Sequence, residues 1–255
     1  RKGRAKSCAA LADEIVAIFP HELPPYEAAG ANISFVGNPL IDTVHGEMEP
    51  EEARIHFGIR AEDVPILLMP GSRREEIERL LPPMLDAAEI LAAEDPARRF
   101  FLPVAGGVDV TQIEGHLAVS SVTVTLTHDA RYALMGIARA AIAASGTVVM
   151  EAAIMGLPAV ILYRMSALSY FVGRLLVDVP RFSLPNILVG ETFETELLQD
   201  EVQPERIAEA MERIIADGAD RAYVMDCLAR AVAKLGAPHA ARRVAEKILA
   251  LARCT

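Results

Sequence analysis

The sequence from Ile142 to Tyr163, IAASGTVVMEAAIMGLPAVILY, constrains the fold more than any other part of the chain. An apolar run ends abruptly at the small residues 145–147. A helix-forming segment follows to Met155, and a second apolar run occupies residues 159–163. Strand, tight turn, helix, loop and strand in this order predict a βαβ unit, which joins two parallel strands.

The turn at residues 145–147 predicts an anion site. A small-residue turn that leads into a helix leaves backbone N–H groups without partners, with the positive end of the helix dipole behind them. A phosphate or diphosphate suits such a place. Glu151 lies about one turn further on, where a carboxylate could accept hydrogen bonds from a ribose. An ordinary βαβ turn with a solvated glutamate fits the same residues, because such turns are common in α/β folds.

Strands and helices alternate before this unit. Apolar runs at residues 64–69, 100–104 and 122–126 predict strands, with helix-forming segments between them. Residues 77–91 have apolar side chains at helical spacing, and Pro82-Pro83 within them predict either a kink or a new helix. The alternation predicts an α/β fold with a doubly wound parallel sheet, which binds ligands at the carboxyl ends of its strands.

The loop Pro70-Gly71-Ser72-Arg73 follows the first of these strands, at the same sheet edge as the Ser145 turn. Gly71 lets the backbone approach a ligand closely. The planar guanidinium of Arg73 suits a phosphate or the developing charge of a diphosphate. Arg74 leaves the choice of arginine ambiguous, and the glutamates that follow can pair with either arginine on a solvated helix.

The sequence predicts one domain boundary and an incomplete first domain. Residues 14–19 and 33–36 predict strands around a short helix, and the acidic run 47–53 is a plausible linker, so we expect a domain boundary near residue 45. Because the chain starts at Arg1 without a methionine and runs directly into helical material, it is expected to be part of a longer protein.

Three further segments follow the central unit. Residues 164–186 carry arginines and aromatic residues in an otherwise acidic chain, which fits either a helix at a bilayer surface or a core helix with flanking arginines. Residues 194–199 predict a short acidic helix. From Pro204 to Arg253 we expect roughly three amphipathic helical segments.

Composition argues against several partners. The net charge of −10 argues against nucleic acid, since a phosphate backbone needs a basic face, and against general adhesion to anionic lipid, although a local basic patch is compatible with it. The cysteines Cys8, Cys227 and Cys254 have no metal-ligand spacing, which predicts reduced thiols in a cytoplasmic protein. No apolar run is long enough to span a membrane. No metal or cofactor is expected.

Three blocks in this order resemble the lipid A disaccharide synthase family: MPGSR after a strand, ASGTVVMEAAIMGLPAVILYRMS, and RFSLPNILVGE with TELLQ. FVGNPLID and GRAK fit the same family, so the resemblance covers essentially the whole chain. It implies a GT-B fold of two Rossmann-like domains. Residues 1–45 would be the tail end of the amino-terminal, acceptor-side domain. Residues 46–255 would be the carboxyl-terminal UDP-sugar-binding domain with a helical tail.

The resemblance also implies a reaction, in which a glycosyltransferase of lipid A biosynthesis condenses UDP-2,3-diacylglucosamine with 2,3-diacylglucosamine 1-phosphate, with inversion. UDP leaves, and lipid A disaccharide 1-phosphate forms. Arg73 and Asn186 would be catalytic, and the presumed general base would lie in the amino-terminal domain. The residues implied to bind the UDP-sugar are Gly71, Ser72, Arg73, Ser145, Gly146, Thr147, Glu151, Tyr163, Arg164, Asn186, Glu196 and Gln199.

One position departs from the family, which usually has a histidine where this chain has Asn38. An amide has no titratable group, so Asn38 is a doubtful site residue. The resemblance further implies peripheral association with the cytoplasmic surface of the inner membrane and a homodimer with exchanged carboxyl-terminal helices. Two alternatives stay open: another UDP-sugar enzyme, such as a UDP-N-acetylglucosamine 2-epimerase, and an isolated UDP-binding half without turnover.

Overall fold

The computed structural model describes residues 2–165 and 180–254 and divides into two compact units. One unit contains the residues up to His45 together with those from Arg230 onward, and the other contains residues 46–229. The sequence also placed a boundary near residue 45, but it grouped the carboxyl-terminal tail with the larger unit rather than with the first 45 residues.

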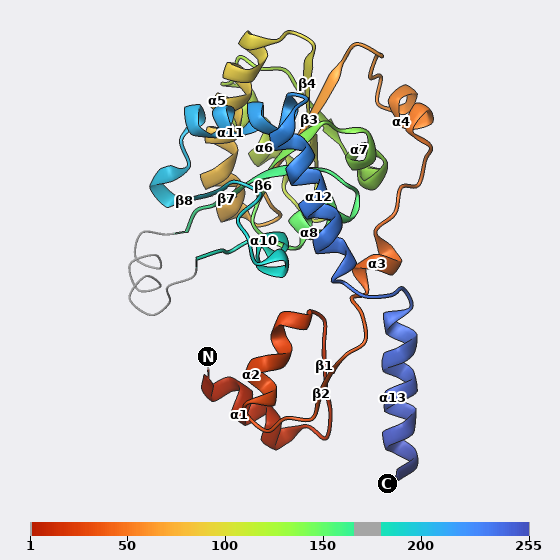
Figure 1. Cartoon of the computed structure of the whole chain (residues 1–255). Helices are drawn as coiled ribbons and strands as arrows, with labels where there is room; N and C mark the ends of the chain where they lie inside the picture. Colours follow the sequence, from red (N-terminus) through yellow and green to blue (C-terminus); the bar gives the residue numbers. More distant parts are fainter. Residues whose placement is uncertain (1, 166–179, 255) are drawn as a thin grey trace. The chain divides into compact units, whose positions relative to one another are not determined.

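The larger unit is built on a six-stranded parallel sheet with the strand order β5-β4-β3-β6-β7-β8 (Figure 1). The chain starts at the central strand β3, moves outward to β5, and then returns to the centre at β6 before moving outward the other way. This is the predicted doubly wound topology. The strands are β3 (Val64–Met69), β4 (Arg98–Pro103), β5 (Val124–Thr127), β6 (Ala140–Ala144), β7 (Ala159–Tyr163) and β8 (Glu196–Leu198).

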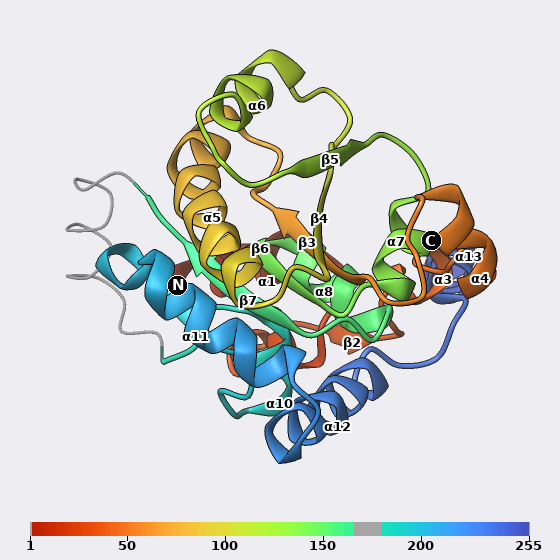
Figure 2. The same cartoon turned by 90° about the horizontal axis from the view of Figure 1, so that it is seen from above.

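Helices cover both faces of this sheet (Figure 2). On one face α5 (Arg74–Glu94) packs against α11 (Pro204–Ile215), and α7 (Arg131–Ile137) and α8 (Thr147–Ile154) lie on the other. The remaining helices of this unit are α4 (Pro50–His56), α6 (Val110–Leu117) and α10 (Leu184–Val189). The last one, α12 (Ala219–Ala233), begins in this unit and ends in the other.

Side chains of each strand alternate between the two faces. Leu67 and Ala141 belong to a core cluster with residues of α7 and α8. Their chain neighbours Ile66 and Ile142 are fully buried and point to the opposite face. Burial on both sides explains why these strands read as continuous apolar runs rather than as alternating patterns.

Three local expectations change in the structure. Residues 194–199, predicted as a helix, contain β8 instead, because pairing of residues 196–198 with β7 and burial of Leu197 outweigh the helix propensity of Glu and Leu. The acidic run 47–53 is not a free linker, since Pro50 begins α4, which packs against α7. α5 continues through Pro82-Pro83, so no new helix begins there.

The smaller unit contains a two-stranded parallel sheet of β1 (Ile15–Ala17) and β2 (Ile33–Phe35). Its helices are α1 (Lys2–Leu11), α2 (Leu23–Glu27), α3 (Leu40–Thr43) and the final helix α13 (Ala240–Cys254), with a 3-10 turn at Pro20–Glu22.

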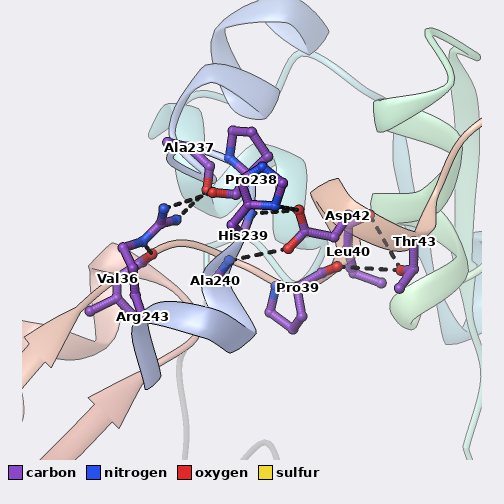
Figure 3. A network of polar contacts seen from close by, with 10 residues as sticks. All are labelled: Val36, Pro39, Leu40, Asp42, Thr43, Ala237, Pro238, His239, Ala240 and Arg243. Carbon is purple, nitrogen blue, oxygen red and sulfur yellow. Dashed lines mark hydrogen bonds and ion pairs between the residues drawn. The ribbon is translucent and has the colours of Figure 1, made fainter. Parts of the chain in front are cut away.

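Hydrogen bonds between distant parts of the sequence hold α13 in this unit (Figure 3). The Asp42 carboxylate accepts from the backbone N–H groups of His239 at 2.6 Å and Ala240 at 3.1 Å, at the start of α13, and these bonds lower the pKa of Asp42. Arg243 donates through Nε to the carbonyl of Val36 at 2.7 Å. These contacts explain why the tail groups with the first 45 residues.

Within residues 2–165 and 180–254, no helix is long and apolar enough to cross a membrane. The interfacial or core helix expected within residues 164–186 falls mostly on residues 166–179, which lie outside the described part of the chain.

Candidate ligand-binding site

A cavity of about 320 Å³ opens at the carboxyl edge of the six-stranded sheet. Its walls include the loop after β3 (residues 70–73), the loop after β4 (103–105) and the turn after β6 (145–147). Chain order reverses between β3 and β6, so their connections leave the sheet in opposite directions and a crevice forms between them. The cavity therefore occupies the place where doubly wound sheets bind ligands.

Gly71 sets the path of the first loop. Its φ of +103° lies in the left-handed region, and a Cβ at this position would collide with Oε2 of Glu76. The chain then enters α5 at the N-cap residue Arg73, whose backbone N–H donates to the same Oε2 at 3.4 Å. Glu76 thus closes the amino end of α5 and forms part of the cavity wall.

The side chain of Arg73 lies at the cavity and is 80% exposed. Its Nη1 donates to Oε1 of Glu76 at 2.6 Å, and this hydrogen bond raises the pKa of the guanidinium, with a smaller contribution from Tyr163. An exposed arginine held by one carboxylate can exchange that partner for an anionic ligand. Arg74, the other arginine considered, does not line the cavity.

The turn of Ser145, Gly146 and Thr147 forms another wall. The N–H of Ser145 donates to the carbonyl of Leu162 in β7 at 2.9 Å, which fixes the turn to the sheet. Gly146 is the N-cap of α8 and has no side chain that could accept from the first N–H groups of the helix. This arrangement leaves those donors, and the positive end of the helix dipole, for a ligand.

Glu151 lies one turn into α8 and lines the cavity with a side chain that is only 11% exposed. It is therefore not the solvated glutamate of an ordinary turn. Its Oε1 accepts from Nη2 of Arg131 at 3.2 Å. Burial disfavours the charged guanidinium, but the hydrogen bond to Tyr132 and the charge of Glu151 together raise the pKa of Arg131.

Arg131 and Glu76 line the cavity but were not among the residues expected from the sequence. Arg131 follows the carboxyl end of β5 after a short loop. The rule that ligands bind at the carboxyl ends of parallel strands, applied to every strand, would have pointed to this segment.

Asn186, expected to act on the substrate, is fully buried and lies outside the cavity. Its Nδ2 donates to the carbonyl of Glu194 at 2.9 Å and to Oε1 of Glu196 at 2.7 Å. Its Oδ1 accepts from the N–H groups of Phe193 at 3.0 Å and Glu194 at 3.1 Å. Both donors and both lone pairs of the amide are used, so Asn186 holds a loop in place.

Glu196 and Gln199 also bind main chain rather than the cavity. The carboxylate of Glu196 accepts from the N–H groups of Phe182 and Ser183 at 2.9 and 3.0 Å, at the start of α10. Gln199 exchanges two hydrogen bonds with the backbone of Met165, at 2.7 and 3.2 Å. We name these two residues and Asn186, with Glu194, the buried network.

Tyr163 and Arg164 follow one another at the carboxyl end of β7, and neither lines the cavity. The ring of Tyr163 lies 5.9 Å from that of Phe182. The guanidinium of Arg164 donates to three backbone carbonyls, those of Arg79, Gln199 and Val202. Arg164 thus connects α5 to the segment that follows β8.

Glu194 is a buried acid within this network. Its Oε1 accepts from the N–H of Ala159 at 3.0 Å, while its buried Oε2 has no hydrogen-bond partner. Burial raises the pKa of Glu194 to about 8, and the charge of Glu196 adds to this effect. At neutral pH the Glu194 carboxyl group is therefore mainly protonated.

Asn38, where the related family usually has a histidine, is also structural. It is buried, its Nδ2 donates to the carbonyl of Ile18 at 2.8 Å, and its Oδ1 accepts from the N–H of Leu40 at 2.9 Å. Elsewhere in the described ranges, no group of three or more His, Cys, Asp or Glu side chains is arranged to hold a metal ion.

Solved structures share this fold at low sequence identity. A UDP-GlcNAc 2-epimerase from Neisseria meningitidis superposes with a TM-score of 0.64 at 16% identity, over 94% of this chain and 62% of that one. The calicheamicin glycosyltransferase CalG4 gives a TM-score of 0.54 at 20% identity, over 95% and 55%. At these identities the likeness shows the fold alone, and it confirms the predicted GT-B-type α/β architecture.

Sequence comparison is more specific. A family model described as lipid-A-disaccharide synthetase matches residues 1–250. The lipid-A-disaccharide synthases of Syntrophus aciditrophicus and Geobacter metallireducens are 39% and 41% identical to this chain over 98% of its length. The chain spans 66% and 65% of these relatives, slightly less than two thirds. By this match, the chain belongs to the lipid-A-disaccharide synthase family.

Proposed function

We propose that this chain is the UDP-sugar-binding part of a lipid-A-disaccharide synthase. In the proposed reaction, a hydroxyl of 2,3-diacylglucosamine 1-phosphate attacks the anomeric carbon of UDP-2,3-diacylglucosamine. The bond from that carbon to the diphosphate breaks with inversion, which gives lipid A disaccharide 1-phosphate and UDP. Family membership supports the reaction class. The observation that supports the ligand class is the cavity at the switch point, with donors for an anion on its walls.

The diphosphate would lie between Arg73 and the amino end of α8. Departure of UDP increases the negative charge on the diphosphate, so donors already aimed at it lower the barrier. The N–H groups of Gly146 and Thr147 are oriented by the turn, and Arg73 can leave Glu76 to pair with the ligand. Gly71 and Ser72 bring backbone close to the same place, and the Glu151 carboxylate would accept hydrogen bonds from the ribose.

The buried network has an indirect role in this proposal. Because the side chains of Asn186, Glu196 and Gln199 are engaged with main chain, they would support other segments rather than contact the sugar. These are the segment before β8, the start of α10 and the loop after β7, respectively. The same holds for Arg164, while Tyr163 would stand near Arg73. Arg73 is then the one proposed catalytic residue of this chain that lines the cavity.

The acceptor side and the general base would belong to the third of the relatives that this chain does not cover. Residues 1–45 would be the tail end of that acceptor-side domain. Both proposed substrates carry acyl chains, so the enzyme would work peripherally at the cytoplasmic surface of the inner membrane. A homodimer is part of the same proposal.

An alternative is that this chain binds UDP but does not turn over by itself, which its partial coverage of the relatives favours. Transfer assays on a full-length relative and on this chain separate the two. Disaccharide formed by both supports an active chain, and disaccharide formed by the relative alone supports the alternative.

Calorimetric titration with UDP, beside uridine, tests the ligand class. We expect saturable binding of UDP and far weaker binding of uridine, because the donors of the cavity serve the diphosphate. Equal affinities for UDP and uridine would contradict the assignment of the cavity's hydrogen-bond donors to the diphosphate. No binding of UDP by the folded chain would contradict the proposed site.

A further inference from the structure

We propose that Arg131 is a positioning residue, which holds the carboxylate of Glu151 in place for the ribose of a bound nucleoside diphosphate. This inference rests on the function proposed for the cavity and adds a residue outside the motifs that indicated the family. Arg131 comes from α7, whereas the expected residues that line the cavity come from α8, the turn before it and the loop that leads into α5.

The first observation is the isolation of Glu151. Its side chain is 89% buried, and Nη2 of Arg131 is its one side-chain partner within the described residues, at 3.2 Å. Burying a polar group of this kind costs free energy unless a charged or hydrogen-bonding partner replaces the water that it loses. Its second oxygen is then left for a ligand in the cavity.

The second observation is that Arg131 is itself held in place. Its guanidinium carbon lies 4.7 Å from the ring centroid of Tyr132, and Nη2 also donates to the Tyr132 hydroxyl at 2.6 Å. The next three residues of α7, Ala133–Met135, are buried in the core. Because α7 and α8 share one core cluster, this packing sets the side from which Arg131 reaches Glu151.

The third observation is the arrangement of charge. Arg131 places a positive charge beside Glu151, and so reduces the repulsion between this carboxylate and a diphosphate in the same cavity. The donors suited to the diphosphate itself, Arg73 and the turn 145–147, come from other walls. Glu47 is the other carboxylate whose charge acts on Arg131. Arg131 thus serves Glu151 and leaves the diphosphate to those donors.

The test compares UDP with 2′-deoxy-UDP and 3′-deoxy-UDP by calorimetric titration of the full chain. Loss of a hydroxyl that donates to a carboxylate weakens binding by roughly 10- to 100-fold, so we expect such a penalty for at least one analogue in the parent. In Arg131→Gln the penalty should fall below about threefold, and in Arg131→Lys it should recover in part. Arg74→Gln, the same charge change outside the cavity, should keep the parent penalty.

Other outcomes overturn the inference. If Arg131→Gln, checked for folding by its thermal transition, weakens UDP and both analogues by one factor, then Arg131 contacts the ligand elsewhere or acts only on the fold. An undiminished penalty in Arg131→Gln shows that Glu151 does not need it. If the parent binds UDP and both deoxy analogues equally well, Glu151 does not bind the ribose, and the proposed UDP site still stands. If the parent binds no UDP, the proposed function itself is contradicted.

Discussion

Two groups of residues around one sheet, those at the cavity and those of the buried network, differ in the partners of their hydrogen bonds. Around the cavity, Arg73 and Glu151 are each held by one oppositely charged side chain, and the turn 145–147 carries backbone donors without a side-chain cap. In the buried network, Asn186 has every donor and acceptor engaged within the protein. Motifs of one family thus contain both kinds of residue, and hydrogen bonds closed within the protein, rather than burial, distinguish the supporting residues from those that can bind a ligand.

The largest expected effect is on stability, for Asn186→Ala. The substitution leaves buried N–H and carbonyl groups around Glu194 without partners, and each costs about 1–3 kcal/mol. We expect a total loss of roughly 4 kcal/mol or more in the free energy of unfolding, measured by urea denaturation. The folded fraction should bind UDP as the parent does. Normal stability with lost UDP binding would move Asn186 into the ligand site.

The pH dependence of stability tests the same network through Glu194. Its folded pKa of about 8 lies above its usual value near 4.5, so its stabilising contribution is complete below pH 4.5 and is lost as pH rises to about 8. We expect the free energy of unfolding to fall by about 2–4 kcal/mol across this window, and Glu194→Gln to flatten the curve. Glu205→Gln on the exposed face of α11 is the control. An equally steep curve in Glu194→Gln would exclude this carboxyl group as the cause.

At the cavity, Arg73→Ala should weaken UDP binding by roughly 10- to 100-fold, because a charged donor to the diphosphate is lost. Its stability should change little, since the side chain is exposed and its ion pair with Glu76 is a surface pair. Calorimetry and thermal unfolding measure the two effects. Arg74→Ala should retain parent affinity, and the opposite ranking of the two arginines would contradict the assignment.

A smaller effect is expected for Gly71→Ala. A side chain at this positive φ strains the loop by about 1 kcal/mol and displaces Glu76. UDP binding should weaken severalfold. Gly106→Ala is the matched control, because no atom lies within 4 Å of the added Cβ and its φ is not in the left-handed region. Equal effects from the two substitutions would argue against a special role for the loop after β3.

The sequence predicted the strands β3 to β7 because their apolar runs end at small or turn-forming residues. The carboxyl-edge rule then indicated the loops 70–73 and 145–147. The local sequence could not predict β8, because its three residues form a strand through their pairing with β7. Nor was the place of α13, which depends on Asp42 and Arg243 contacts between distant segments.

The roles of individual site residues were harder to predict. A motif names Asn186 without showing that its amide is used up inside the protein. Arg131 meets Glu151 only because α7 and α8 share one face of the sheet, and no spacing in the sequence encodes that contact.

Hydrogen exchange of backbone amides with and without UDP tests the central claim most directly, because it reads both groups of residues in one experiment. Slower exchange with UDP in residues 71–76 and 145–149, and unchanged exchange in residues 186–198, is the predicted result. Protection confined to residues 186–198, with none at the two cavity loops, would contradict the division between ligand-binding and supporting residues.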